Sequence, residues 1–423
     1  MNYDKTILSN GATVLSEKRP GVRSVTLGIW YRVGSRDETP DEAGLSHFME
    51  HMRFKGTEKR AAAQISIDFD SLGAESNAFT SREFTCFYAR CVDTALEQSF
   101  EILADMLLHS TFPSKEVESE RKVVIEEIAR AEDTPDDHVY DLLGDELFPT
   151  QTIGRPVLGT RESVGSFTHD DLERYQQKHY HAANCVIAAS GNIDHSKLVE
   201  LSEKYLGEME SGKERNLRVY TPEKNRKFLV AEKKDTEQAN ILLGMYGLPA
   251  GHDDRFAMSL LETALGGGMS SRLFQEIREK RGLAYSVYAG SNAYEGIGSF
   301  VIYAGTRPEN IAKVVEVVQE ELAKVVEGGL TQEELDRVRA YAVGLTTLSD
   351  ESTRNHMMKL GKNAMQGTPI LSLDEIIEEY KRVTLDDISK VASEVLTQKP
   401  SVAIVSPLQE REVESVLKDV IEL

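Results

Sequence analysis

Two widely separated stretches of this chain repeat the same pattern. Around residue 77 the sequence reads Asn-Ala-Phe-Thr before an apolar, strand-like run, and around residue 292 it reads Asn-Ala-Tyr before a similar run. A helical pattern, a Pro or Gly break and an acidic helix follow each copy, at 112–117 and at 330–335. The two Asn-Ala segments are separated by nearly the same number of residues as the two acidic helices. We therefore interpret the protein as two homologous halves.

The length of the chain predicts two to four subdomains, since 423 residues are too many for one ordinary core. A polar stretch at 213–226, which contains Pro222, interrupts the periodic patterns on both sides. We therefore predict one half at 1–212, this linker, and a second half at 227–423.

The periodicity within each half predicts an α+β fold. Residues 25–33 are apolar at every second position, as in a half-buried strand, whereas 95–108 and 311–326 have helical spacing. Strands and helices that segregate in this way predict antiparallel-type sheets covered by helices on one face.

Composition excludes several classes of protein. The formal charge of −21 argues against nucleic acid or an anionic membrane as a partner, although an acidic interior that attracts basic peptides would also fit it. No apolar run is long enough to cross a membrane, and residues 6–15 form two strand-like runs around an Asn-Gly turn rather than a signal peptide. We expect a cytoplasmic protein whose three cysteines are buried free thiols.

The pentapeptide His47-Phe48-Met49-Glu50-His51 carries the strongest chemical signal. His47 and His51 are four residues apart, so a helix places both imidazoles on one face, as two ligands of a tetrahedral zinc require. Glu50 lies between them and can accept a proton without binding the metal. This His-x-x-Glu-His order defines the inverzincins. The alternative is a surface helix end with two solvated histidines.

A third ligand is available in the helical segment 119–128. Glu120 and Glu127 are seven residues apart and therefore lie on the same helical face. Val123, Val124 and Ile128 form an apolar stripe that we expect to anchor this helix against the core. The alternative for the two glutamates is an acidic, solvated helix face.

With these motifs the chain resembles the pitrilysin family of zinc peptidases, and most closely the branch that contains the mitochondrial processing peptidase β subunit and shorter bacterial relatives. The spacing from His51 to Glu127 matches that family's ligand glutamate, and Glu120 matches a second glutamate that supports a ligand. The resemblance extends over nearly the whole chain, through segments at 44–47, 54–57, 77–83, 271–274 and 278–285.

The resemblance implies two α/β-roll halves that face each other as a clamshell. It implies that His47, His51 and Glu127 hold one Zn²⁺ per chain, with Glu50 as the general base. One residue departs from the family pattern, because relatives usually have an apolar residue at Arg53. Helical spacing turns Arg53 away from the ligands, so we expect it to affect packing or the substrate cleft.

The resemblance also assigns roles outside the metal site. Arg278 and Tyr285 match an Arg and Tyr pair of the second half that supplies a hydrogen-bond donor to the oxyanion. The alternative for Tyr285 is a core strand aromatic. The pair Asn77 and Ala78 matches an edge strand that a peptide substrate extends. Phe54 either lines the pocket before the scissile bond or packs in the core.

The motifs predict a zinc-dependent endopeptidase, and the resemblance implies that it hydrolyses peptides or unfolded segments within a closed chamber and forms a homodimer. The alternative is a non-catalytic or regulatory partner subunit of a processing-peptidase-like complex. Such subunits usually lose a metal ligand or the base, whereas His47, His51, Glu127 and Glu50 are all present here. The sequence leaves open whether the substrate is one dedicated protein or a general pool of peptides.

Overall fold

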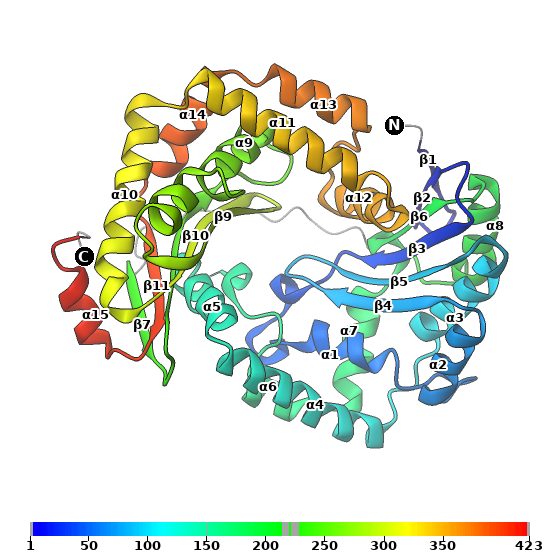
Figure 1. Cartoon of the computed structure of the whole chain (residues 1–423). Coiled ribbons are helices and arrows are strands. Elements are labelled where there is room, and N and C mark those ends of the chain that lie inside the picture. Colours follow the sequence, from blue (N-terminus) through cyan, green and yellow to red (C-terminus); the bar gives the residue numbers. More distant parts are fainter. Residues whose placement is uncertain (1–2, 150, 214–219, 221–227, 421–423) are drawn as a thin grey trace. The chain divides into compact units, whose positions relative to one another are not determined.

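The computed structural model describes residues 3–149, 151–213, 220 and 228–420, and their contacts group the chain into two compact units. Each unit has one β-sheet with helices packed on it (Figure 1). Unit 1 consists of Met1–Ala129, Arg155–Leu217 and Leu348–Ser372, and unit 2 of Arg130–Gly154, Arg218–Thr347 and Leu373–Leu423.

The sheet of unit 1 has six strands in the order β1-β2-β6-β3-β5-β4. All neighbouring strands are antiparallel except the parallel pair β2 and β6. Strand β3 is almost completely buried, and β4 forms one edge of the sheet. The strands are β1 (Asp4–Ile7), β2 (Thr13–Lys18), β3 (Ser24–Tyr31), β4 (Glu75–Thr80), β5 (Thr85–Val92) and β6 (Cys185–Gly191).

The sheet of unit 2 has five strands in the order β7-β11-β8-β10-β9, with one parallel pair, β7 and β11. Without β1, the first sheet has the same order and the same strand directions, so β4 corresponds to β9. The repeated sequences near 77 and 292 lie on these two edge strands. The strands are β7 (Leu229–Lys233), β8 (Ala239–Gly247), β9 (Ala284–Tyr294), β10 (Ile297–Thr306) and β11 (Ser401–Ser406).

The helices form where apolar residues recur on one face and polar side chains cap the first turn. Helix α7, for example, begins at a capping box in which the Thr168 hydroxyl accepts a hydrogen bond from the Asp171 amide, while Leu172 and Tyr175 are buried. The helices of unit 1 are α1 (Leu45–Met52), α2 (Ala62–Ser71), α3 (Leu96–Leu108), α4 (Ser114–Asp133, which continues into unit 2), α6 (Arg161–Ser166), α7 (His169–His179), α8 (His195–Leu206) and α12 (Thr353–Gln366).

In unit 2 most helices pack on one side of the sheet, around the long, apolar helix α10. A π-helical turn at Phe274–Glu279 precedes β9. The helices are α5 (Pro135–Leu147), α9 (Arg255–Gly266), α10 (Ile311–Gly328), α11 (Gln332–Ser349), α13 (Leu373–Arg382), α14 (Leu385–Leu396) and α15 (Glu410–Leu417). Helix α9 occupies the place along the chain that α1 has in the first half, and it has no histidine.

Two helices pack on the sheet of the other sequence half. Helix α12 lies on β2, β3 and β6, and α5 lies on β8 and β11 (Figure 1). Close packing of α12 requires Gly361, because a Cβ atom there would lie 2.1 Å from the Trp30 indole. Helices therefore contact both faces of each sheet, and our expectation of one covered face was wrong. Periodicity shows that a helix has an apolar face, but not which sheet buries it.

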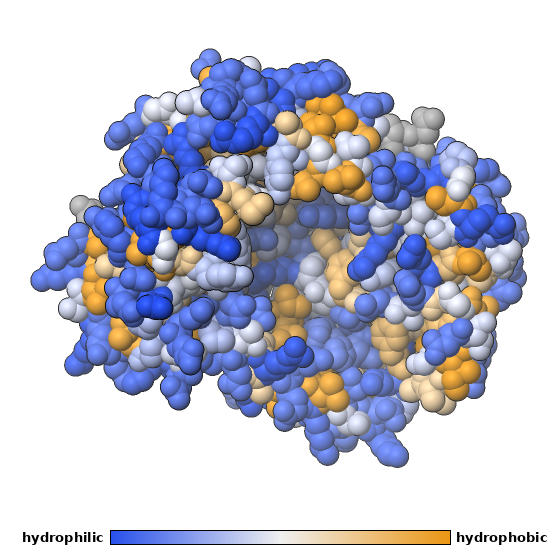
Figure 2. Space-filling view, in the orientation of Figure 1, coloured by the Kyte–Doolittle hydropathy of each residue, from blue (hydrophilic) through white to orange (hydrophobic). Residues whose placement is uncertain are grey.

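The two sheets lie within the predicted halves, 1–212 and 227–423, but the linker 213–226 falls almost wholly outside the described residues, so that boundary stays a prediction. All three cysteines are buried and unpaired, as predicted. None of the described helices has the length and apolarity needed to cross a membrane. The face of the molecule drawn in Figure 2 is mainly hydrophilic, with separate hydrophobic patches.

Candidate active site

Helix α1 presents the two histidines because its opposite face is held in the core. Phe48, Met49 and Met52 are completely buried, whereas His47 and His51 are only partly covered. The two imidazole rings lie one helical turn apart, with 4.5 Å between their centroids. The predicted helix and the common face of the two histidines are thus present.

A buried carboxylate fixes the start of α1. Glu38 accepts hydrogen bonds from the backbone amides of Gly44, at 2.8 Å, and Ser46, at 2.7 Å. Burial raises the pKa of Glu38 to about 7, although both backbone hydrogen bonds oppose this shift. The Ser46 hydroxyl also bonds to the Tyr175 hydroxyl at 2.7 Å. These contacts hold the helix that carries the histidines.

Helix α4 brings the predicted third ligand to the histidines. The Glu127 Oε2 atom lies 3.7 Å from His47 Nε2 and 3.5 Å from His51 Nε2. Ligand atoms of a tetrahedral zinc are separated by roughly 3.3–3.5 Å at ordinary zinc–ligand distances. Of the predicted anchoring stripe, Val124 and Ile128 are buried as expected, but Val123 is 43% exposed.

The two histidines have different polar surroundings. Burial lowers the pKa of His47 to about 3, so its imidazole is neutral at neutral pH, as a metal ligand must be. Burial alone would lower the pKa of His51, but the Glu120 hydrogen bond and the Glu127 charge outweigh burial and raise it. His51 Nδ1 lies 2.8 Å from the Glu120 carboxylate, which leaves Nε2 directed toward Glu127.

Glu50 lies beside the three candidate ligands but is not one of them. Its carboxylate accepts a hydrogen bond of 2.5 Å from the Thr80 hydroxyl at the end of β4. Burial raises the pKa of Glu50 above its ordinary value, and the Thr80 hydrogen bond partly opposes the shift. A partly desolvated carboxylate with a raised pKa is suited to accept and return a proton.

Two supporting residues were missed at the level of sequence. Thr80 orients Glu50, and Lys55 forms an ion pair of 2.6 Å with the second oxygen of Glu120. Both residues lie inside segments that resemble the family, 77–83 and 54–57, so the signal was present. Their partners could not be assigned without the fold.

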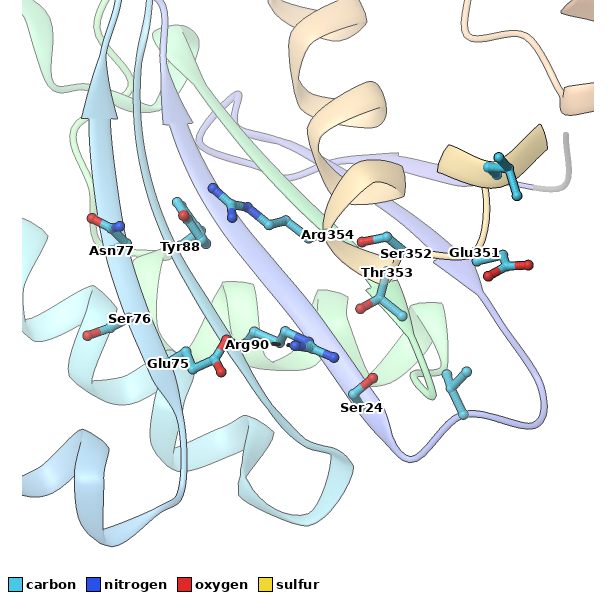
Figure 3. Close-up of a pocket in the computed structure, with 12 residues that line it drawn as sticks. Ser24, Glu75, Ser76, Asn77, Tyr88, Arg90, Glu351, Ser352, Thr353 and Arg354 are labelled. Carbon is cyan, nitrogen blue, oxygen red and sulfur yellow. Dashed lines mark ion pairs between the residues drawn. The ribbon is translucent and has the colours of Figure 1, made fainter. Parts of the chain in front are cut away.

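The predicted peptide strand, Asn77 and Ala78, lies on the edge strand β4. A cavity of about 610 Å³ opens beside it, lined by β3, β4, β5 and the start of α12. Figure 3 shows Asn77 and Tyr88 on neighbouring strands and Arg354 extending toward them from α12. The Arg354 guanidinium lies 5.0 Å from the centre of the Tyr88 ring.

Phe54 belongs to the hydrophobic core rather than to this cavity. Its side chain is partly buried against the main core of unit 1, with its ring centre 6.5 Å from that of Phe87. Phe54 does not line the cavity beside β4. Phe54 thus packs against the core, and its role in the pocket before the scissile bond stays a prediction.

Arg278 and Tyr285 form a stacked pair in unit 2. Arg278 lies on the π-helical turn and Tyr285 on β9, and the guanidinium is 4.6 Å from the centre of the Tyr285 ring. Tyr285 is 74% exposed, so the alternative of a buried core aromatic is wrong. Its hydroxyl group makes no hydrogen bond with any residue that the structure describes, so it can donate to a ligand.

Arg53 is completely buried, although no carboxylate pairs with it among the described residues. Its guanidinium lies between the rings of Phe112 and Tyr180, at 5.2 and 4.8 Å from their centres. It donates to the Leu107 carbonyl at 2.8 Å, whereas Nε and Nη2 have no hydrogen-bond partner there. Burial lowers the pKa of Arg53. The departure from the family pattern therefore affects packing.

We expect Arg53→Met to leave the protein equally stable or to stabilise it by about 1–4 kcal/mol, because an apolar side chain of similar length removes a buried, unpaired charge. Arg53→Ala should destabilise it by about 2–5 kcal/mol, because it leaves a cavity between the two rings. Thermal or urea unfolding of both variants measures this. A stability loss as large for Met as for Ala would show that the charge itself stabilises the core.

Comparisons with known proteins agree with this site. Residues 13–161 match the family model of the insulinase peptidases, family M16, and residues 166–341 match the model of the M16 inactive domain. The chain is 42% identical to an uncharacterized zinc protease of Streptomyces coelicolor, over 96% of this chain and 90% of that protein. It is also 42% identical to the uncharacterized zinc protease YmxG of Bacillus subtilis, over 94% of this chain and 97% of that protein. The chain belongs to the M16, or pitrilysin, family of zinc metallopeptidases.

Solved structures show the same fold. A protease from Helicobacter pylori superposes with a TM-score of 0.88 at 23% identity, covering 96% of this chain and 99% of the other. A Pseudomonas fluorescens structure described as a peptidase M16 inactive domain superposes with a TM-score of 0.90 at 22% identity, covering 97% of this chain and 98% of the other. The family models and relatives confirm the predicted family, and these structures confirm the predicted α+β class with two sheets.

Proposed function

We propose that this protein is a zinc-dependent endopeptidase that cleaves peptides or unfolded segments, within the closed chamber that the family resemblance implies. One observation carries the proposal. Ligand atoms of His47, His51 and Glu127 lie within 4.8 Å of one another, and the partly buried carboxylate of Glu50 lies on the same helix as the histidines. Two imidazoles and a carboxylate are the donor set of many catalytic zinc sites.

His47, His51 and Glu127 would hold the metal, and Glu120 would orient His51. A bound zinc supplies Lewis acidity, which makes water a nucleophile near neutral pH and polarises the peptide carbonyl. Glu50 accepts the proton of the attacking water and delivers it to the leaving amine. Thr80 holds the Glu50 carboxylate in place through its hydrogen bond.

A substrate would bind in extended form beside Asn77 and Ala78. Strand β4 is a sheet edge that a peptide can extend, and the peptide would replace the 2.8 Å hydrogen bond that the Ala78 amide donates to the Asn77 side chain. Main-chain hydrogen bonds of this kind make little demand on sequence but require an unfolded segment. Stable folded domains should therefore be poor substrates.

The proposal also gives Tyr285 a part in the reaction, and we expect Tyr285→Phe to lower kcat by about 10²–10³-fold, the usual loss for one oxyanion donor. Zinc content and melting temperature should not change, because the side chain is 74% exposed. Steady-state kinetics with metal analysis measures this, and Tyr341→Phe is a control at another exposed tyrosine of unit 2. An unchanged kcat would show that Tyr285 does not donate to the oxyanion and that the residues of unit 1 carry out the reaction without it.

The alternative function is a non-catalytic partner subunit. Incubation of the zinc-loaded protein with a mixed peptide pool, followed by mass spectrometry of the products, separates the two. We expect internal cleavage that a chelator abolishes and that added zinc restores. Peptides left intact by a protein that contains about one zinc per chain would favour the partner subunit.

We further propose that the protein is cytoplasmic and that it forms a homodimer. The homodimer is inferred because the related four-domain enzymes contain about twice as many half-units as this chain. Sedimentation equilibrium at micromolar concentration should give twice the 47.2 kDa mass of one chain. A single species with the mass of one chain would refute the dimer without affecting the peptidase assignment.

A further inference from the structure

A cavity of about 450 Å³ in unit 2 is cationic, although the chain as a whole is strongly acidic. Arg278 and Arg307 line it, and no Asp or Glu does so within the part of the chain that the structure describes. The whole chain has 70 acidic and 49 basic residues, so a cavity with two arginines and no acid departs from the average. Such a local excess of positive charge favours an anionic ligand.

The terminal nitrogens of Arg278 are available for a ligand. The guanidinium plane lies over the rings of Phe274, at 4.8 Å, and Tyr285, at 4.6 Å, which fixes its orientation. The nearest carboxylate contact is long, 3.8 Å between Nε and the Glu279 side chain. Stacking thus positions this arginine without using its hydrogen-bond donors.

Arg307 is exposed, and its guanidinium makes no hydrogen bond or ion pair with any residue that the structure describes. Its backbone is nevertheless held in place. The preceding Thr306 is buried and donates a hydrogen bond of 2.5 Å to the Leu283 carbonyl, and Pro308 begins a short 3₁₀ turn directly after it. An unpaired arginine on a fixed backbone adds a second guanidinium to the same cavity.

We propose that Arg307, together with Arg278, forms a subsite for a carboxylate of the peptide substrate, so that the enzyme prefers peptides with an acidic residue or a free C-terminus at this position. The planar guanidinium fork matches a carboxylate in two parallel hydrogen bonds. The Glu279 side chain, 3.8 Å from Arg278 Nε, offsets part of the Arg278 charge, so Arg307 is the arginine of this cavity on which the preference mainly depends. Arg307 is then a specificity-determining residue, and this inference rests on the proposed peptidase function.

Binding of matched peptides tests the subsite without requiring cleavage. Each pair of peptides differs only by Glu or Gln at one position, or by a free acid or an amide at the C-terminus. Fluorescence anisotropy measures the Kd of each peptide for the zinc-loaded Glu50→Gln protein. We expect one acidic peptide to bind about tenfold more tightly than its neutral partner, as one charge-assisted hydrogen bond provides. Adding Arg307→Gln should remove this difference, and Arg307→Lys should retain part of it.

The control is Arg382→Gln, which removes another exposed positive charge of the same unit, on α13, where it is paired with Glu379. A tenfold difference that depends on the Glu residue identifies a side chain as the ligand, and one that depends on the terminal acid identifies the chain end. Equal binding of all pairs, or a preference that survives Arg307→Gln, overturns the subsite. Failure of the proposed function gives a different result, which is peptide binding without cleavage by the wild-type protein.

Discussion

Glu50→Gln should reduce turnover to below roughly 1% of the wild-type value while zinc stays bound, because general acid–base catalysis contributes about 10²–10⁴-fold. Glutamine keeps the shape of the side chain and can still accept the Thr80 hydrogen bond through its carbonyl oxygen, but it cannot take up a proton. Measurement of kcat on a cleaved peptide, together with zinc content, gives both quantities from one preparation.

Glu58→Gln is a suitable control, since Glu58 is an exposed residue shortly after the same helix. It should leave kcat and zinc content unchanged. Peptide affinity should also be similar in Glu50→Gln and the wild type, because proton transfer stabilises the transition state rather than the bound substrate. If Glu50→Gln retained several per cent of the wild-type turnover, another group would have to act as the base.

The metal site could be predicted from sequence because its signals are local. His47, Glu50 and His51 lie within one helical turn and a half, and the spacing of Glu120 and Glu127 needs only a regular helix. The structure then places Glu127 beside the histidines, as the family resemblance implied. Local periodicity also predicted β3, α3 and α10 within a few residues.

Features that depend on contacts between distant parts of the chain could not be predicted in the same way. Helix α12 packs closely on β3 because Gly361 leaves room for the Trp30 side chain of that strand, and neither residue indicates the other in the sequence. The burial of Arg53 is a second example, since its neighbours Phe112 and Tyr180 come from two other segments. The apolar neighbours of Tyr285 in sequence left open the alternative of a core strand residue, and only its exposed position on the edge strand β9 excludes that alternative.

Substitutions of three glutamates on α4 should have graded effects on zinc binding. Glu127→Ala removes a proposed ligand and should weaken zinc affinity by more than about 100-fold, with corresponding loss of peptidase activity at limiting zinc. This lower limit follows because loss of a supporting partner alone costs about 10–100-fold. Glu120→Gln should fall within that smaller range, since it weakens the hydrogen bond to His51 and the ion pair with Lys55 but leaves all three ligands.

Glu126→Gln is the matched control, because Glu126 is exposed, adjoins Glu127 on the same helix and is not part of the metal group. Its zinc affinity should equal that of the wild type. Competition with a chromogenic chelator measures all three affinities, and melting temperatures without metal show whether each variant is folded. If Glu127→Ala bound zinc as tightly as Glu126→Gln, the third ligand would have to be another residue. If Glu120→Gln lost more affinity than Glu127→Ala, the two glutamates would have exchanged roles.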